Sequence, residues 1–174
     1  MQMREETRRQ RYDDKKRNAT SLPLSIVTVN FECDDNLAFT IRTAACYGVD
    51  TVYVIGSIPD RKFLAPRSGS LYDYVNLHSF SHPRDFVAFA RENEYKIVSA
   101  ELVDGAVSLF DYEFDTDVHT CLVLGHERTG VPIECIINGD CISIPMPGVG
   151  FCLNTSQTGT AIMTEYVRQF LEKK

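Results

Sequence analysis

The sequence predicts an α/β fold with a mainly parallel sheet flanked by helices. Short runs rich in β-branched residues alternate along the chain with longer segments whose apolar residues recur every three or four positions. The strand-like runs, such as "LSIVTVNF" and "VHTCLVLG", are apolar almost throughout, which is typical of parallel strands buried on both faces. At 174 residues the chain is long enough for one domain with a sizeable core.

Local signals place the helices. Leu37, Ile41 and Ala45 lie four apart and predict a helix over 34–49, which Asp34 or Asp35 can cap at its start and Gly48 can end. Pro83 near a first turn predicts a second helix over 82–94. A third is predicted from about 153 to 171, where Ile162, Tyr166 and Phe170 lie four apart.

The strands are predicted by compact apolar runs, and residues 57–73 between them are rich in turn residues. The expected strands are 24–31, 51–56, 74–80, 95–102, 118–125 and 141–146. Residues 1–20 are expected to be a basic, flexible tail, and residues 21–174 to form the one domain.

Composition excludes several protein classes. No apolar run approaches the roughly 18–20 residues that span a bilayer, so no membrane segment is expected. The six cysteines form no C-x-x-C pair, which favours reduced thiols in a cytoplasmic protein over disulfides or a metal site. The net charge is −6, yet residues 1–18 carry seven basic and four acidic side chains. The acidic remainder is not the usual surface of a strong nucleic-acid binder.

Common catalytic and nucleotide motifs are incomplete. "GVG" at 148–150 stands alone after the last strand, no G-K-[ST] follows a glycine loop, and His126-Glu127 continues without the second histidine of a zinc protease. Cys152 has no evident histidine partner, so a thiol hydrolase is unsupported. Unusual chemistry is concentrated instead where three strands end, which is where parallel sheets bind ligands. These segments are "NFECDDN", "LGHERTGVP" and "IPMPGVGFCLN".

Together with the residues that follow them, the three segments resemble the SpoU (TrmH) branch of the SPOUT superfamily of RNA methyltransferases. "NLAFTIRTA" matches the family pattern N-x-x-x-x-x-R-T-A, and "LVLGHERTGVP" matches L-V-x-G-x-E-x-x-G-[LV]. "ISIPMPGVGFCLNTS" matches I-P-M-x-G-x-x-x-S-L-N-x-S except that Cys152 replaces the usual serine. The resemblance covers residues 24–172 and places the three motifs in the family order.

The resemblance implies a deep C-terminal trefoil knot whose loops bind S-adenosylmethionine. It offers an explanation for residues 141–164, which contain no charged side chain, because small residues and glycines let backbone segments pass closely. The donor-binding positions that it implies are Ala100, Glu101, Leu124, Gly125, Glu127, Gly130, Ile144, Met146, Cys152 and Leu153.

The implied function is methylation of a ribose 2′-hydroxyl in RNA. The family's functional positions correspond to Asn36, Arg42, Glu127, Cys152 and Asn154. A guanidinium is an excellent phosphate ligand and a poor base, so Arg42 is expected to position a phosphate. The positive charge for RNA binding is expected from Arg42, Arg67 and Arg128 together with the tail.

The implied partners are RNA and a second copy of the chain. Minimal members of the family act as homodimers, for which the helix over 34–49 and the C-terminal helix are the candidate interface. Transfer RNA is the favoured substrate and ribosomal RNA is an alternative. A knotted RNA-binding or assembly protein without catalysis is the rival interpretation, supported by Cys152, and methylation of a base or a protein is a weaker third.

Overall fold

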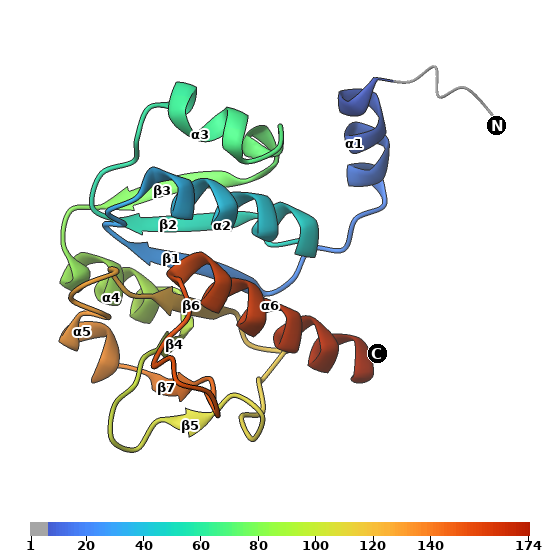
Figure 1. Ribbon diagram of the computed structural model, residues 1–174. Coiled ribbons are helices and arrows are strands. Elements are labelled where there is room, and N and C mark those ends of the chain that lie inside the picture. Colours follow the sequence, from blue (N-terminus) through green and yellow to red (C-terminus); the bar gives the residue numbers. More distant parts are fainter. Residues whose placement is uncertain (1–6) are drawn as a thin grey trace.

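The computed structural model describes residues 7–174, and within them seven strands form one sheet in which every pairing is parallel (Figure 1). The strand order is β3-β2-β1-β6-β4-β7-β5. This arrangement confirms the predicted α/β class. The strands are β1 (Leu24–Val29), β2 (Thr51–Ile55), β3 (Asn76–Phe80), β4 (Lys96–Ala100), β5 (Val107–Ser108), β6 (Thr120–Leu124) and β7 (Asp140–Ser143).

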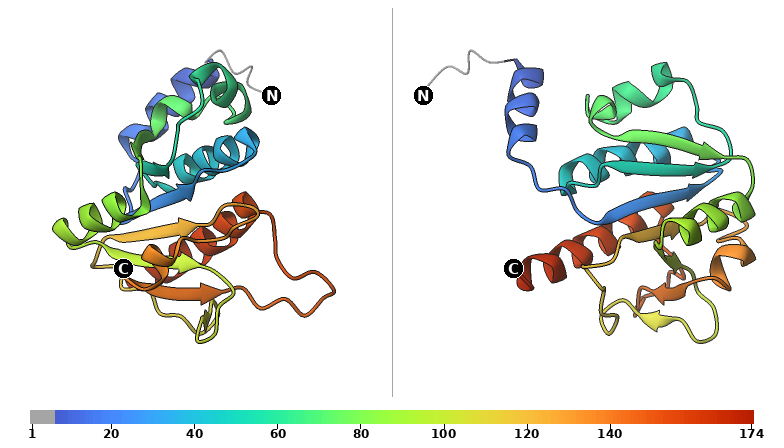
Figure 2. Two further views of the ribbon diagram at one scale, coloured as in Figure 1. Left: turned by 90° about the vertical axis from the view of Figure 1, so that its left-hand side faces the viewer. Right: turned by 180° about the vertical axis from the view of Figure 1, so that it is seen from behind.

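Helices cover both faces of the sheet (Figure 2). One face carries α2 (Asp34–Tyr47), α3 (Arg61–Arg67) and α6 (Thr155–Glu172), and the other carries α4 (Pro83–Glu92) and the short α5 (Ile133–Ile136). Helices α2 and α6 lie side by side, and the Tyr47 hydroxyl is 2.8 Å from that of Thr164 across their contact. The three-layer order explains why the strands are apolar on both faces.

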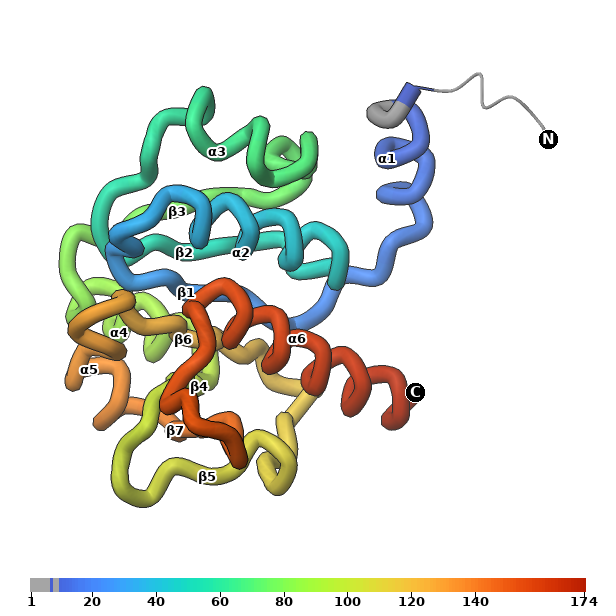
Figure 3. Tube along the Cα trace, in the orientation of Figure 1, coloured from blue at the N-terminus to red at the C-terminus, as the bar shows by residue number. Residues whose placement is uncertain are grey.

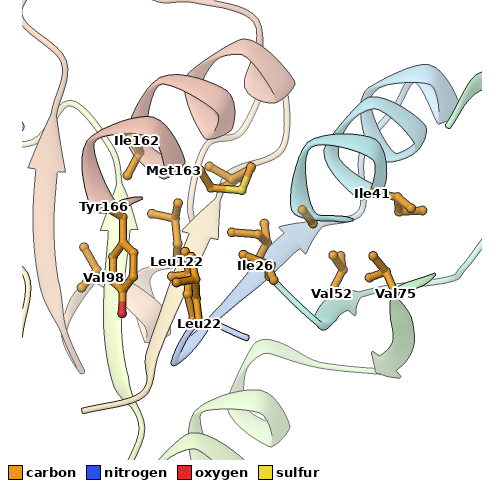
Figure 4. Packing of buried hydrophobic residues seen from close by; sticks show 14 of the residues in the cluster. Leu22, Ile26, Ile41, Val52, Val75, Val98, Leu122, Ile162, Met163 and Tyr166 are labelled. Carbon is orange, nitrogen blue, oxygen red and sulfur yellow. The ribbon is translucent and has the colours of Figure 1, made fainter. Parts of the chain in front are cut away.

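The core is divided into two apolar clusters by the sheet. Ile26, Leu122 and Val98 point to the layer of α2 and α6, where they meet Ile41, Ile162, Met163 and Tyr166 (Figure 4). Val27 and Val123 point to the other side and pack against Phe86 and Val87 of α4. Full burial of such side chains stabilises the fold by about 1.5–3 kcal/mol each.

Strand β6 is inserted between β1 and β4. Its last residue, Leu124, pairs with Thr28 of β1 and with Ala100 of β4. The three strands therefore end level with one another. The loops that follow them leave the sheet at one edge, although residues 30, 101 and 125 are far apart in the chain.

The two ends of α2 are made differently. Gly48 ends the helix in the left-handed conformation (φ +79°), as predicted, and an added Cβ would overlap the Thr20 carbonyl oxygen. The helix begins at Asp34 as predicted, but the predicted cap is wrong, because Cys33 occupies the N-cap and makes no side-chain capping bond. Asp34 and Asp35 lie in the first turn, where their charges favour the helix dipole.

Some local structure differs from the expectation. Residues 57–73, predicted as turns, contain α3 with Pro66 inside it, and then η1 (Tyr72–Tyr74), a 3₁₀ turn. The predicted tail contains helix α1 (Arg8–Arg17), whose Tyr12 ring meets Tyr74 edge-on at 5.9 Å between centroids. Residues 1–6 of that tail lie outside the described residues. The expected flexibility of residues 1–20 stays a prediction.

The charge-free segment runs from β7 back to the start of α6 beside β6 (Figure 3). The role expected for its first glycines is wrong, because Gly148 and Gly150 have no positive φ and open space surrounds the position of a Cβ on each. Close approach occurs at Gly159, where a Cβ would lie 2.7 Å from Leu124 Cδ1. The trefoil knot stays a prediction with which this parallel topology is consistent.

Candidate active site

A pocket of about 300 Å³ opens at the edge of the sheet where β4, β6 and β7 end. Its walls are the loops after these strands and the first turns of α6. Parallel sheets bind ligands at this edge. The structure brings together here every donor position that the family resemblance implied: Ala100, Glu101, Leu124, Gly125, Glu127, Gly130, Ile144, Met146, Cys152 and Leu153.

The loop after β6 is shaped by two glycines. His126 and Gly130 exchange backbone hydrogen bonds of 3.1 and 2.9 Å, which closes the loop into a tight turn. A Cβ on Gly125 would overlap the Gly130 carbonyl carbon. Gly130 has φ +71°, and its Cβ would overlap a carboxylate oxygen of Glu101. Only glycine allows this close approach of backbone and carboxylate at the pocket wall.

Glu101 is held by backbone donors at the start of its loop. Its Oε2 accepts a 2.7 Å hydrogen bond from the Val131 N–H, and its Oε1 accepts one of 3.0 Å from the Leu102 N–H. The bond from Val131 connects the loop after β4 to the loop after β6, and the bond from Leu102 orients the carboxylate within its own loop. They also fix a negative charge on the pocket wall.

Glu127 connects the pocket to the start of α2. Its Oε1 accepts a 2.6 Å hydrogen bond from Asn36 Nδ2 and a longer one, 3.4 Å, from the Cys33 N–H, and its Oε2 accepts one of 2.9 Å from the Glu32 N–H. Partial burial alone would raise the pKa of Glu127, but the hydrogen bonds outweigh it, so the pKa lies below its ordinary value. Glu127 is therefore a structural carboxylate and a poor general base.

Two other predicted catalytic residues lie on the segment that enters α6. Cys152 lines the pocket and is exposed. Asn154 is the N-cap of α6, and its Oδ1 accepts hydrogen bonds from the backbone N–H and the hydroxyl of Ser156 at 2.9 and 2.7 Å. Capping is thus the role of Asn154 that the geometry supports directly.

The three predicted RNA-binding arginines differ in their contacts. Arg67 forms an ion pair with Asp35, and Arg128, at the pocket, forms one of 2.7 Å with Glu32. Arg42 lies on α2 with its guanidinium against Gly69, and it does not line the pocket. Across residues 7–174, no carboxylate pairs with Arg42.

Sequence reasoning missed part of the pocket. Thr155, Thr158 and Ile162 project from the first two turns of α6, and Leu102 and Phe151 stand exposed at the rim. The Thr155 hydroxyl oxygen is buried and has no hydrogen-bond partner among the described residues. The third motif does not single out Thr155, Thr158 or Ile162. The predicted start of α6, directly after the loop that follows β7, could have indicated that its first turns face the pocket.

Metal and membrane sites find no support in the described part of the chain. No three histidine, cysteine or carboxylate side chains gather as metal ligands do in residues 7–174. Over the same residues, every helix is too short or too polar to traverse a bilayer.

Comparisons with known proteins agree with the motifs. The model of the SpoU rRNA Methylase family matches residues 23–164. The chain is 30% identical over 135 residues to a tRNA (guanosine(18)-2′-O)-methyltransferase of Escherichia coli K12, covering 77% of this chain and 58% of the relative. It is also 30% identical over 141 residues to a 23S rRNA (uridine(2479)-2′-O)-methyltransferase of Streptomyces viridochromogenes, covering 77% of this chain and 48% of the relative. The chain thus spans about half the length of these curated relatives.

Solved structures show the same fold. The SpoU methyltransferase AviRb from Streptomyces viridochromogenes, in complex with the cofactor AdoMet, superposes with a TM-score of 0.77 at 22% identity. The match covers 92% of this chain and 66% of that one.

We predict that Glu127→Gln lowers the free energy of unfolding by about 1 kcal/mol at pH 7, because an amide –NH₂ would replace one acceptor oxygen. The folded-state pKa is below the unfolded value, so this stabilisation is complete above about pH 4.5 and is lost as the pH falls through the folded pKa. Urea titrations should show that the difference in the free energy of unfolding between wild type and variant is smaller at about pH 3 than at pH 7.

Glu113→Gln is the matched control, because no hydrogen bond or ion pair involving the Glu113 carboxylate occurs within the described residues. It should change stability little at either pH. If Glu127→Gln lowers the free energy of unfolding as much at about pH 3 as at pH 7, the role assigned to the charged carboxylate is contradicted.

Proposed function

Because the chain belongs to the SpoU rRNA Methylase family, we propose that it is an S-adenosylmethionine-dependent RNA methyltransferase that modifies a ribose 2′-hydroxyl. The observation that carries the proposal is that all ten expected donor positions line one pocket. The curated relatives are 2′-O-methyltransferases of tRNA and of 23S rRNA. Transfer RNA is the favoured substrate, because the match to this chain covers 58% of the tRNA enzyme and 48% of the rRNA enzyme. Ribosomal RNA is the alternative.

The pocket fits the donor in shape and chemistry. Leu124, Ile142 and Ile162 are almost fully buried and give it an apolar inner wall suited to an adenine ring. The Glu101 and Glu127 carboxylates provide negative charge for a cationic sulfonium. When bound, S-adenosylmethionine supplies the methyl group. The protein's part is to hold the donor and the ribose oxygen in line, from which most of the rate enhancement can come.

Arg42 is proposed to bind the phosphate next to the target ribose. It has no carboxylate partner within residues 7–174, so its guanidinium is available to a phosphate. Arg67 and Arg128 are held in exposed ion pairs, which are weak and can be exchanged for phosphate contacts. The basic segment 1–20 is proposed to extend this surface beyond the domain 21–174.

A homodimer is proposed because the pocket of one chain lacks Arg42. Helices α2 and α6 form a paired outer surface on which Phe39 stays 45% exposed. A second copy packed on this surface covers Phe39 and can place its own Arg42 at the pocket. The cytoplasm is the proposed location, since all six cysteines are free thiols.

The dimer is tested by sedimentation equilibrium. The wild type should be a dimer at micromolar concentration, and Phe39→Glu should weaken the association about tenfold or more by burying an unpaired charge. Phe110→Glu is the matched control, because Phe110 is 72% exposed on the loop after β5. A monomeric wild type would contradict the proposed dimer.

We predict that the protein transfers labelled methyl groups from S-adenosylmethionine to RNA and that Arg42→Ala loses more than nine-tenths of this activity, a barrier increase above about 1.4 kcal/mol. The thermal stability and donor affinity of the variant should be unchanged, because Arg42 is exposed on α2. Arg84→Ala on α4, across the sheet, should stay active.

Product analysis separates the alternatives. Nuclease digestion and mapping of alkali-resistant positions should give a 2′-O-methyl nucleoside in tRNA or, for the alternative substrate, in rRNA. A base-methylated nucleoside would exclude ribose chemistry. Donor binding with no transfer to any RNA would favour a non-catalytic RNA-binding protein.

We predict that Cys152→Ser retains or increases methyl transfer. Cys152 is an exposed position at the pocket where the hydroxyl of serine can only improve on the weak hydrogen bonding of a thiol. Intact mass after incubation with donor alone gives the independent measurement. A stable gain of one methyl group on the wild type, missing from an inactive serine variant, would make the sulfur a covalent nucleophile and overturn this role.

A further inference from the structure

The Thr155 hydroxyl is an unpaired polar group at the pocket. It is the first residue of α6 and lines the pocket, yet its Oγ1 is buried with no hydrogen-bond partner among the described residues. Leaving a hydroxyl buried and unpaired destabilises a fold, and such groups in native proteins generally have a partner that is missing from view. No group of residues 7–174 bonds this hydroxyl in the conformation observed, so it is open to a partner from outside the chain.

The surroundings of Thr155 identify the chemistry of that partner. Ile162, two turns further along α6, forms the apolar inner wall of the pocket together with Leu124 and Ile142 of the sheet. The charged groups of the pocket, Glu101, Glu127 and Arg128, belong to the loops after β4 and β6. A ligand that reaches the inner wall needs a flat apolar surface with a polar edge. An adenine ring has both.

We propose that Thr155 is a donor-binding residue whose hydroxyl hydrogen-bonds the edge of the adenine of S-adenosylmethionine. The inference rests on the proposed function and adds to it a side chain that selects adenine as the base of the methyl donor. No hydrogen bond holds the hydroxyl in the position observed, so rotation about χ1, for which threonine has two accessible rotamers in helices, can turn it to the ligand. The hydroxyl gains its partner only in the complex.

The proposal predicts effects of opposite sign for Thr155→Val. Valine has the same shape but removes the unpaired hydroxyl, so the apo protein should melt about 2–4 °C higher. The same change should weaken binding of S-adenosylhomocysteine, the demethylated donor, about 5- to 10-fold in calorimetry. A residue with a purely structural role would not separate stability from affinity in this way.

Thr120→Val is the matched control. The Thr120 hydroxyl is also buried and unpaired, but it lies at the start of β6, away from the pocket. It should share the rise in melting temperature and keep wild-type affinity. Thr155→Ser, which keeps the hydroxyl and loses only the methyl group, should bind S-adenosylhomocysteine within about twofold of wild type. If the valine variant does not fold, the base preference of the wild type and of the serine variant tests the proposal.

The adenine contact is tested with the counterpart of S-adenosylhomocysteine in which hypoxanthine replaces adenine. Wild type should prefer the adenine form, and Thr155→Val should lose most of that preference. An unchanged preference, or a valine variant that binds as tightly as Thr120→Val, would overturn the proposal and leave the methyltransferase function standing. A wild type that binds no donor at millimolar concentration would overturn both.

Discussion

The insertion of β6 between β1 and β4 is the constraint on which the rest of the structure depends. Because Leu124 is level with Thr28 and Ala100, the loops that follow the three strands meet at one edge of the sheet. The loop after β6 then has the loop after β4 on one side and the start of α2 on the other. The hydrogen bonds of Glu101 to Val131 and of Glu127 to Asn36 depend on that middle position.

Two carboxylates turn this arrangement into a preorganised site. Glu101 receives the Val131 N–H from the neighbouring loop, and Glu127 receives the amide of Asn36 and two backbone N–H groups at the start of α2. The helix that carries Arg42 is thereby attached to the loop that lines the donor pocket. A shift of that loop would be transmitted to α2, which is a physical route for coupling the proposed donor site to the phosphate site proposed at Arg42.

The sequence predicted the parts of the fold that depend on local pattern. The apolar runs located β1, β2, β4, β6 and β7, and the four-residue spacing in 37–45 and 162–170 located α2 and α6. Helix α3 was not predicted, because Pro66 lies inside it and its one buried residue, Leu64, gives no apolar periodicity. The ten positions implied by the resemblance all line one pocket, and their assignment to donor binding stays a prediction.

Other features could not be predicted because they join residues with no local relation. Asn36 and Glu127 are 91 positions apart, and nothing in either motif shows that they share a hydrogen bond. The separation of Arg42 from the pocket depends on how α2 crosses the sheet. The glycines of residues 141–164 were expected where chain segments pass closely, but only Gly159, where α6 meets Leu124, makes such an approach, and Gly148 and Gly150 do not.

The strand order also has a consequence for biosynthesis. Strands β1, β2 and β3 are neighbours and emerge from the ribosome in succession, so they can pair as they are made. Strand β4 has neighbours, β6 and β7, that are both synthesised after it. Until Leu124 has emerged, the nascent chain carries an apolar strand with two open edges, the type of segment that chaperones protect from aggregation.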